Sequence, residues 1–183
     1  MMMLRTIRLD PSDTFVFPVA AEPGEWAVTG SFLFWGRDVA ALAGKERAAF
    51  RSGFAGVSSL GFSTLVVAQP IRAEERAAAV DSLARHLVDR LGAPDMDAAR
   101  AAAAEEIAFA ASLAEHPEGT LVAMYRALEA GEIREQFRTL AAREKTAGAD
   151  SLHATARAFT FHEEVEDGPE ERVDLIDMMA ARK

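Results

Sequence analysis

The sequence predicts an α+β fold with a mixed or mainly antiparallel sheet of about five to six strands and helices packed mostly on one face. Three observations favour this class. Apolar and polar residues alternate over residues 120–140, as in a β-hairpin. Residues 62–71 are apolar at both odd and even positions, as in a central strand, and residues 73–114 have helical periodicity. Strands and helices segregated in this way are typical of a sheet with its helices gathered on one side.

The hairpin is predicted around the turn Glu129-Ala130-Gly131. Gly131 adopts a positive φ at no steric cost, which suits a type I turn closed by a bulge. Arg126 and Glu135 are expected to pair across the core-facing side, near its rim. The apolar residues expected to cover the core on that side are Val122, Met124, Ile133 and Phe137.

The N-terminal part of the chain predicts a first hairpin. Residues 4–19 indicate one bent strand or two short ones, residues 22–25 a type II turn, and residues 26–35 the returning strand. Large rings concentrate here, which indicates either the core face of the sheet or a stacking wall for a ring-shaped ligand or a partner. These rings are Phe15, Phe17, Trp26, Phe32, Phe34 and Trp35.

Helices are predicted in the middle of the chain. Asp38 is expected to cap a helical segment whose middle is weakened by Gly44. Residues 56–61 are expected to form a small flexible connection rather than a phosphate loop, because they contain no lysine. A helix is predicted over residues 73–91 and a second over about 97–114. The alanines of the second helix allow close approach, either to the first helix or to the same helix in a second subunit.

The C-terminal part predicts a polar loop over residues 141–150 and a strand over residues 153–161. Eight acidic residues and one basic residue then lie between Glu163 and Asp177. We expect one domain over residues 1–183. The acidic segment 163–183 is either a peripheral arm or carries a last helix that belongs to the core.

Composition excludes several classes of function. The chain has 183 residues, a net charge of −9 and no cysteine, which argues against nucleic acid or an anionic membrane as the main partner and against disulfides and thiolate chemistry. Charged residues appear before any apolar leader segment could form, and no apolar run is long enough to cross a membrane. We therefore expect a cytoplasmic protein.

The strongest metal-like cluster in the sequence is His162 with Glu163. Imidazole beside carboxylate suits a hard or borderline divalent ion, but a solvated acidic terminus is the competing interpretation. An enzyme would use His153, His162 and Glu163 near the sheet edge. No serine stands in a nucleophile elbow, and no cofactor fingerprint is present, so no cofactor is expected.

A second candidate site lies on the outer side of the predicted hairpin. Arg134 and Arg138, with Tyr125 nearby, could hold an anion or an acidic partner. The alternative is an ordinary solvated strand face. Trp26 and Trp35 complete the set of candidate ligand-binding residues.

Several stretches resemble a bacterial protein family of unknown function. They are LRTIRLDPSDTFVF, AAEPGEWAVTGSF, GFSTLV, EEIAFAASLAEHPEGTLVAMYR and GEIREQFRTL. The family is associated with gene clusters for molybdenum-dependent formate dehydrogenase and its maturation factors. The resemblance implies an accessory role in redox-enzyme assembly and offers no catalytic residues to transfer.

Together these observations favour a non-enzymatic cytoplasmic module that binds a protein partner and forms a homodimer. The first alternative is a small-molecule or metal-dependent enzyme with a His/Glu site. The second is a ligand-binding domain with a deep apolar pocket behind Trp26 and Trp35.

Overall fold

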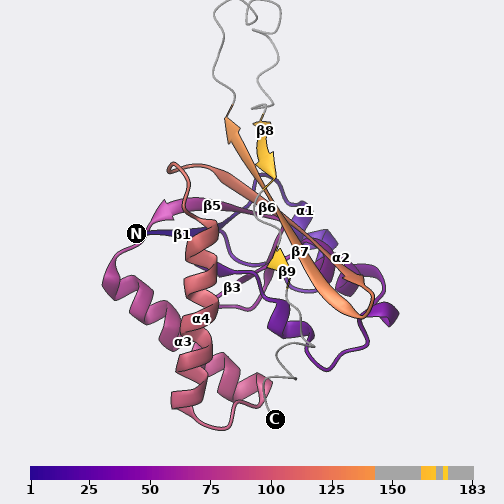
Figure 1. The fold of residues 1–183 in the computed structure, drawn as a ribbon, viewed down its shortest axis with the longest axis vertical. Helices are drawn as coiled ribbons and strands as arrows, with labels where there is room; N and C mark the ends of the chain where they lie inside the picture. Colours follow the sequence, from indigo (N-terminus) through magenta and orange to yellow (C-terminus); the bar gives the residue numbers. More distant parts are fainter. Residues whose placement is uncertain (143–161, 168–170, 173–183) are drawn as a thin grey trace, which may run out of the picture.

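The computed structural model describes residues 1–142, 162–167 and 171–172 (Figure 1). The predicted α+β class is confirmed. The larger sheet has six strands in the order β1-β5-β6-β7-β8, with β9 also pairing with β7, and every one of these pairings is antiparallel. The strands are β1 (Met2–Ile7), β5 (Leu65–Pro70), β6 (Leu121–Glu129), β7 (Glu132–Ala142), β8 (His162–Asp167) and β9 (Glu171–Arg172).

A second, three-stranded antiparallel sheet was not predicted. It consists of β2 (Ala27–Val28), β3 (Phe54–Gly56) and β4 (Phe62–Ser63). The helices are α1 (Ser12–Val16), α2 (Gly44–Ser52), α3 (Ala73–Leu91) and α4 (Met96–Leu113), and two short 3-10 helices are η1 (Ser31–Phe34) and η2 (Val39–Ala41).

The two long helices form close to where the sequence predicts them. Gly92 ends α3 with a φ of 75°, and the Asp95 side chain accepts a hydrogen bond from the Ala98 N–H at 2.8 Å, which caps α4. Figure 1 shows α3 and α4 side by side. The α4 alanines Ala99, Ala103 and Ala110 are fully buried, so close helix approach is achieved within one chain.

One core joins the two sheets and the long helices. The ring of Phe137 on β7 lies 6.0 Å from Phe109 of α4, edge to face, and 6.4 Å from Phe54 of the small sheet. Such aromatic pairs contribute about 0.5–1.5 kcal/mol each beyond their buried area. The helices and the small sheet therefore cover the same face of the larger sheet.

The strands of the predicted first hairpin are wrong, although its turn over residues 22–25 forms: Gly24 has a φ of 90°, and the Glu25 N–H donates to the Glu22 carbonyl at 3.4 Å. Residues 12–16 form α1 and residues 31–34 form η1, while β1 pairs with β5 and has an isolated bridge between Arg5 and Trp26. The cause is a tertiary contact: the buried Asp13 carboxylate accepts hydrogen bonds from the backbone N–H and the hydroxyl of Thr64. Thr64 also separates β4 from β5, so the apolar run 62–71 is two strands rather than one.

Asp38 caps a different element from the one predicted. Its side chain accepts a hydrogen bond from the Ala40 N–H at the start of the short helix η2. The longer helix α2 begins only at Gly44, whose φ is 55°. Gly44 therefore starts a helix instead of weakening the middle of one.

The turn between β6 and β7 is a two-residue loop. Glu129 pairs with Glu132, and the intervening Ala130 and Gly131 have φ values of 52° and 87°. Two positive φ values define a type I′ turn, so the predicted type I turn with a bulge is wrong. Type I′ prevails because its twist matches that of the paired strands.

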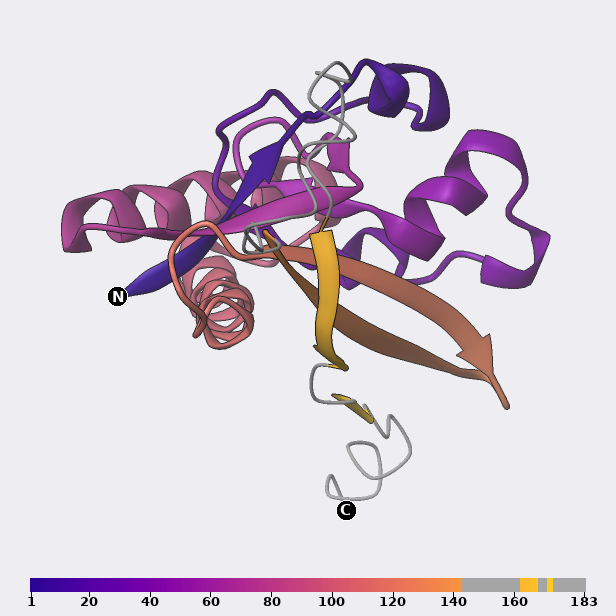
Figure 2. The ribbon, with the colours of Figure 1, turned by 90° about the horizontal axis from the view of Figure 1, so that it is seen from above.

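The hairpin projects beyond the rest of the sheet (Figure 2). β5 pairs with β6 only from Leu121 to Ala123, so among the described residues no strand pairs with the remainder of β6 on that side. Helix α2 contacts this part of β6 instead. The projecting half of the hairpin is thus supported by the N-terminal third of the chain.

The acidic segment contributes backbone to the sheet. β8 pairs with residues 138–142 of β7, with a register shift between Thr139 and Leu140, and β9 pairs with Arg134 and Glu135. Most of the loop predicted over residues 141–150 and the strand predicted over residues 153–161 lie outside the described residues, as does the predicted last helix.

Replacing Ala130 with glycine should stabilise the protein by about 1 kcal/mol, because the left-handed backbone conformation costs a residue with a Cβ about 1–2 kcal/mol. Chemical denaturation monitored by circular dichroism measures this change. Gly131→Ala is the matched control and should lower stability, since its added Cβ meets nothing within 4 Å and only the backbone strain changes. A lower midpoint for Ala130→Gly would contradict the type I′ assignment.

Candidate interaction surface

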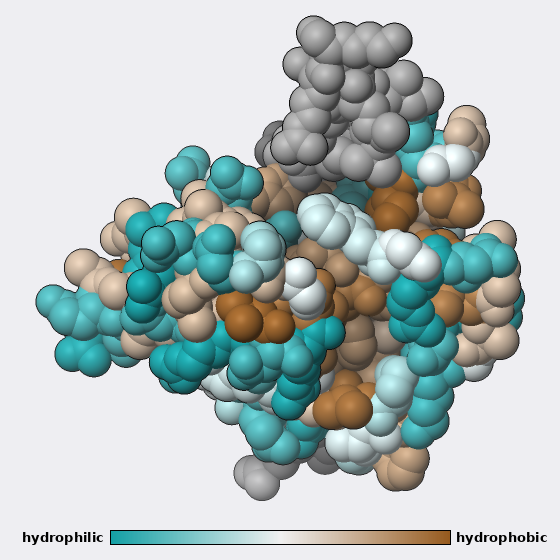
Figure 3. All heavy atoms as spheres, turned by 90° about the horizontal axis from the view of Figure 1, so that it is seen from below, coloured by the Kyte–Doolittle hydropathy of each residue, from teal (hydrophilic) through white to brown (hydrophobic). Residues whose placement is uncertain are grey.

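Large apolar side chains are exposed along residues 9–19. Leu9 is 63% exposed, Phe15 72%, Val16 41% and Val19 58%. They follow one another between β1 and the small sheet, with α1 among them. Figure 3 shows apolar residues gathered near the middle of the face seen from below, bordered by hydrophilic ones.

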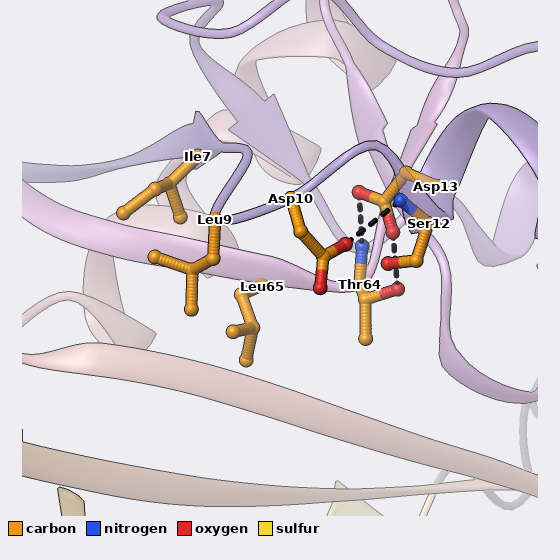
Figure 4. Close-up of a pocket in the computed structure, with 7 residues that line it drawn as sticks. All are labelled: Ile7, Leu9, Asp10, Ser12, Asp13, Thr64 and Leu65. Atoms are coloured by element: carbon orange, nitrogen blue, oxygen red, sulfur yellow. Dashed lines mark hydrogen bonds between the residues drawn. The ribbon is translucent and has the colours of Figure 1, made fainter. Parts of the chain in front are cut away.

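Two buried residues hold this stretch in place. Asp13 binds the Thr64 N–H at 3.2 Å and the Thr64 hydroxyl at 2.6 Å (Figure 4). One turn later, Phe17 is 1% exposed, and its ring lies 5.9 Å from that of Phe62. Because the buried residues are one helical turn apart, the residues between them face outward. We name residues 9–19 the apolar stretch.

A shallow hollow of about 120 Å³ lies at the start of the apolar stretch, lined by residues that Figure 4 labels. Its exposed carboxylate, Asp10, accepts a hydrogen bond from the Ser12 N–H. Hydrogen bonds from the Ser12 side chain and then its backbone hold the pKa of Asp10 below its usual value. Asp10 therefore stays ionised, and its hydrogen bonds are lost only as the pH falls through this lowered pKa.

A second hollow, of about 220 Å³, lies beside the end of the apolar stretch. Pockets that enclose small molecules are usually about 300–1,000 Å³, so neither hollow has the size of such a site. We name the second hollow the aromatic pocket. Its lining residues are Pro18, Leu33, Phe34, Arg37, Glu46, Ala49, Leu60 and Phe62.

The aromatic pocket is backed by a second apolar cluster and by a buried cation. Arg126 on β6 has no exposed surface, and its guanidinium carbon lies 5.7 Å from the ring centroids of both Phe34 and Phe50. Its Nε donates to the Glu135 carboxylate at 2.6 Å. The predicted Arg126–Glu135 pair is therefore confirmed, but it is buried and not near the rim.

Backbone carbonyls complete the coordination of this guanidinium. The two Nη atoms donate to the carbonyl oxygens of Phe50 and Thr29, each at 2.8 Å. Arg126 thus ties the hairpin to the end of α2 and to the turn after β2. Sequence reasoning found the acidic partner but had no signal for the two carbonyls, because backbone acceptors leave no trace in side-chain pattern.

The two tryptophans predicted to bind a ligand lie in different environments. Trp26 is half-buried, and the guanidinium of Arg5 stacks 4.9 Å from its ring. Trp35 is 74% exposed at the end of η1. Neither tryptophan lines either hollow. The apolar pocket expected behind these two residues stays a prediction.

Two of the three residues of the predicted anion site make side-chain contacts within the chain. The Tyr125 hydroxyl accepts a hydrogen bond from Arg51, whose guanidinium also lies 5.2 Å from the Tyr125 ring. Arg134 pairs with Glu129 at 3.2 Å. Arg138 is exposed, and its backbone pairs with Asp167 of β8.

The predicted metal residues are only partly described. His162 and Glu163 begin β8, where their backbones pair with Ala142 and Ala141, and their side chains lie outside the description. His153 falls outside the described residues. Within the described part of the chain, no group of three or more His, Cys, Asp and Glu side chains could hold a metal ion.

The loop of residues 56–61 holds an anion that sequence reasoning missed. The Glu25 carboxylate accepts hydrogen bonds from the backbone N–H groups of Ser58 and Ser59 at 3.0 and 2.9 Å. A Cβ on Gly56 would lie 2.6 Å from that carboxylate, which explains the glycine. The chain therefore fills this backbone nest with its own side chain.

Sequence comparison matches residues 1–158 to a family of unknown function (DUF6505). The chain belongs to this family. Membership of a family of unknown function is what the quoted sequence stretches predicted. Comparison with curated proteins and with solved structures found no match. Among the described residues of this DUF6505 protein, no helix is long and apolar enough to span a bilayer.

Removing one member of the buried ion pair should destabilise the fold strongly. Arg126→Met leaves a buried carboxylate and two carbonyls without their donor, which should cost about 3–5 kcal/mol. The double variant Arg126→Met/Glu135→Leu should recover much of this loss, because no charge is left uncompensated. Chemical denaturation of both single variants and the double variant gives the coupling energy.

The exposed pair Arg134–Glu129 in the same hairpin is the matched control. Its side chains are 41% and 53% exposed, so Glu129→Gln should change stability by no more than about 1 kcal/mol. Additive effects of Arg126→Met and Glu135→Leu would contradict the assigned role of the buried pair.

Proposed function

We propose that this DUF6505 protein is a non-enzymatic cytoplasmic module that binds another protein through the apolar stretch. The carrying observation is the exposure of four large apolar side chains, between 41% and 72%, on a segment fixed by Asp13 and Phe17. Clustered apolar exposure of this kind is typical of protein–protein interfaces.

The fixed backbone strengthens this proposal. Binding costs conformational entropy when a loop must be ordered, and a segment already held in its conformation avoids much of this cost. The Asp13–Thr64 hydrogen bonds and the burial of Phe17 hold residues 12–17 before any partner arrives. Phe15 and Val16 are therefore displayed with little left to order.

The sizes of the hollows favour a protein ligand over a small molecule. At about 120 and 220 Å³ they are too small to enclose a typical metabolite. The alternative of an enzyme using His153, His162 and Glu163 rests on side chains outside the described residues, so it has no geometry in its support.

The proposal has two finer parts. The first is self-association as a homodimer through the same surface, since the α4 alanines that offered another interface, Ala99, Ala103 and Ala110, are buried within the chain. The second, drawn from the resemblance, is an accessory role in a bacterium that assembles a molybdenum-dependent formate dehydrogenase. Both concern the identity of the partner rather than the surface that binds it.

Replacing Leu9 and Phe15 with serine should abolish partner binding and leave the fold intact. Both side chains are more than 60% exposed, so their loss should change stability by about 0.5 kcal/mol or less. Affinity purification with the wild-type chain and the double variant, together with native mass spectrometry, measures partner and subunit number. Leu91→Ser on α3, at a residue 41% exposed, is the control.

Equal recovery of the same partners by the wild-type chain and the double variant would contradict the proposal. A homodimer that persists in the double variant would place self-association on another surface.

A further inference from the structure

The aromatic pocket has the size and lining of a receptor for one large side chain. Leu33, Phe34, Leu60 and Phe62 supply apolar walls, and the rings of Phe34 and Phe62 lie 6.0 Å apart. Ala49 of α2 is 1% exposed and leaves the space open because its side chain is a single methyl group. About 220 Å³ holds one Leu, Met or Phe side chain but not a whole metabolite.

Two residues of the aromatic pocket are each followed in the chain by an exposed apolar residue. Pro18 and Phe34 line the pocket, and the residues that follow them, Val19 and Trp35, are 58% and 74% exposed. Interfaces concentrate their binding energy where an anchor side chain enters such a pocket and nearby apolar contacts exclude water. The pocket is thus continuous in the chain with the apolar stretch.

The charge around the pocket is opposite to that of the chain. Between residues 36 and 52 there are four cationic and two acidic side chains, a local charge of +2 in a chain of −9. Arg37 lies at the pocket, pairs with Glu46 and sits 5.9 Å from the Phe34 ring. All six of these charged residues are exposed, so the net positive charge of this segment favours carboxylates over basic groups.

We propose that the aromatic pocket receives one large apolar side chain from an acidic segment of a partner protein. The proposal rests on the proposed function and names the chemistry of the partner. The apolar anchor packs against the Phe34 and Phe62 rings, which contact each other in the wall of the pocket. Carboxylates that flank the anchor meet Arg37, which already binds a carboxylate in Glu46.

The test uses a short fluorescein-labelled peptide of aspartate, glutamate and alanine with one central phenylalanine. Fluorescence anisotropy with the full chain should show saturable binding. Replacing the phenylalanine with alanine, or the acidic residues with lysine, should weaken binding about tenfold or more, which corresponds to about 1.4 kcal/mol. Equal binding of all three peptides would overturn the proposal.

Two variants of the chain locate the binding. Ala49→Leu fills the pocket from a helix that tolerates leucine, and Arg37→Glu reverses the charge at the pocket; each should weaken peptide binding about tenfold. The matched controls are Ala101→Leu on α4 and Arg85→Glu on α3, both at exposed positions away from the pocket. Circular dichroism confirms that each variant is folded.

The outcomes separate this inference from the proposed function. If Leu9→Ser/Phe15→Ser loses its partner but Ala49→Leu and Arg37→Glu keep it, the interaction module stands and the pocket inference fails. If Ala49→Leu instead dissolves a homodimer and leaves peptide binding unchanged, the occupant is a second copy, and an acidic partner is excluded.

Discussion

The guanidinium of Arg126 is the constraint that sets how the two halves of the chain meet. A cation with no exposed surface must be neutralised and hydrogen-bonded, or it costs several kcal/mol. Glu135 supplies the charge from the neighbouring strand, while Phe50 and Thr29 supply carbonyls from segments far earlier in the chain. Because each acceptor is directional, only one placement of the projecting hairpin against α2 satisfies them all. This placement also shapes the aromatic pocket, because Phe34 lines the pocket and its ring packs against the Arg126 guanidinium.

The apolar stretch shows how a surface can be exposed and yet well defined. Asp13 and Phe17 place its buried anchors one turn apart, and the hydrogen bonds to Thr64 come from the junction between β4 and β5. The same junction therefore ends a strand of the small sheet, begins a strand of the large one and fixes a helix on the surface. A partner that binds here meets a segment whose position is set by both sheets.

Elements made by neighbours in the chain could be predicted, and elements made by distant contacts could not. The helices α3 and α4 and the β6–β7 hairpin follow from periodicity, caps and alternation over short spans. Helix α1 was predicted as strand because Asp13 finds Thr64 only in the folded protein, and the small sheet pairs strands too short to show a period. Of the candidate binding residues, Trp35 could be named from the sequence because large aromatic residues concentrate in that part of the chain. The Glu25 nest was missed because its donors are backbone N–H groups.

The register of β1 against β5 also bears on how the chain is made. β1 leaves the ribosome long before residues 65–70, to which it pairs, and β5 in turn waits for β6 to cover its other edge. The helical hairpin and the β6–β7 hairpin close over short loops, which is fast, whereas strand pairings distant in sequence form slowly. The apolar Met3 and Leu4, fully buried in the finished fold, are therefore uncovered for much of synthesis. For this architecture the risk of aggregation is greatest while β1 is unpaired, and it ends when β5 and β6 have emerged.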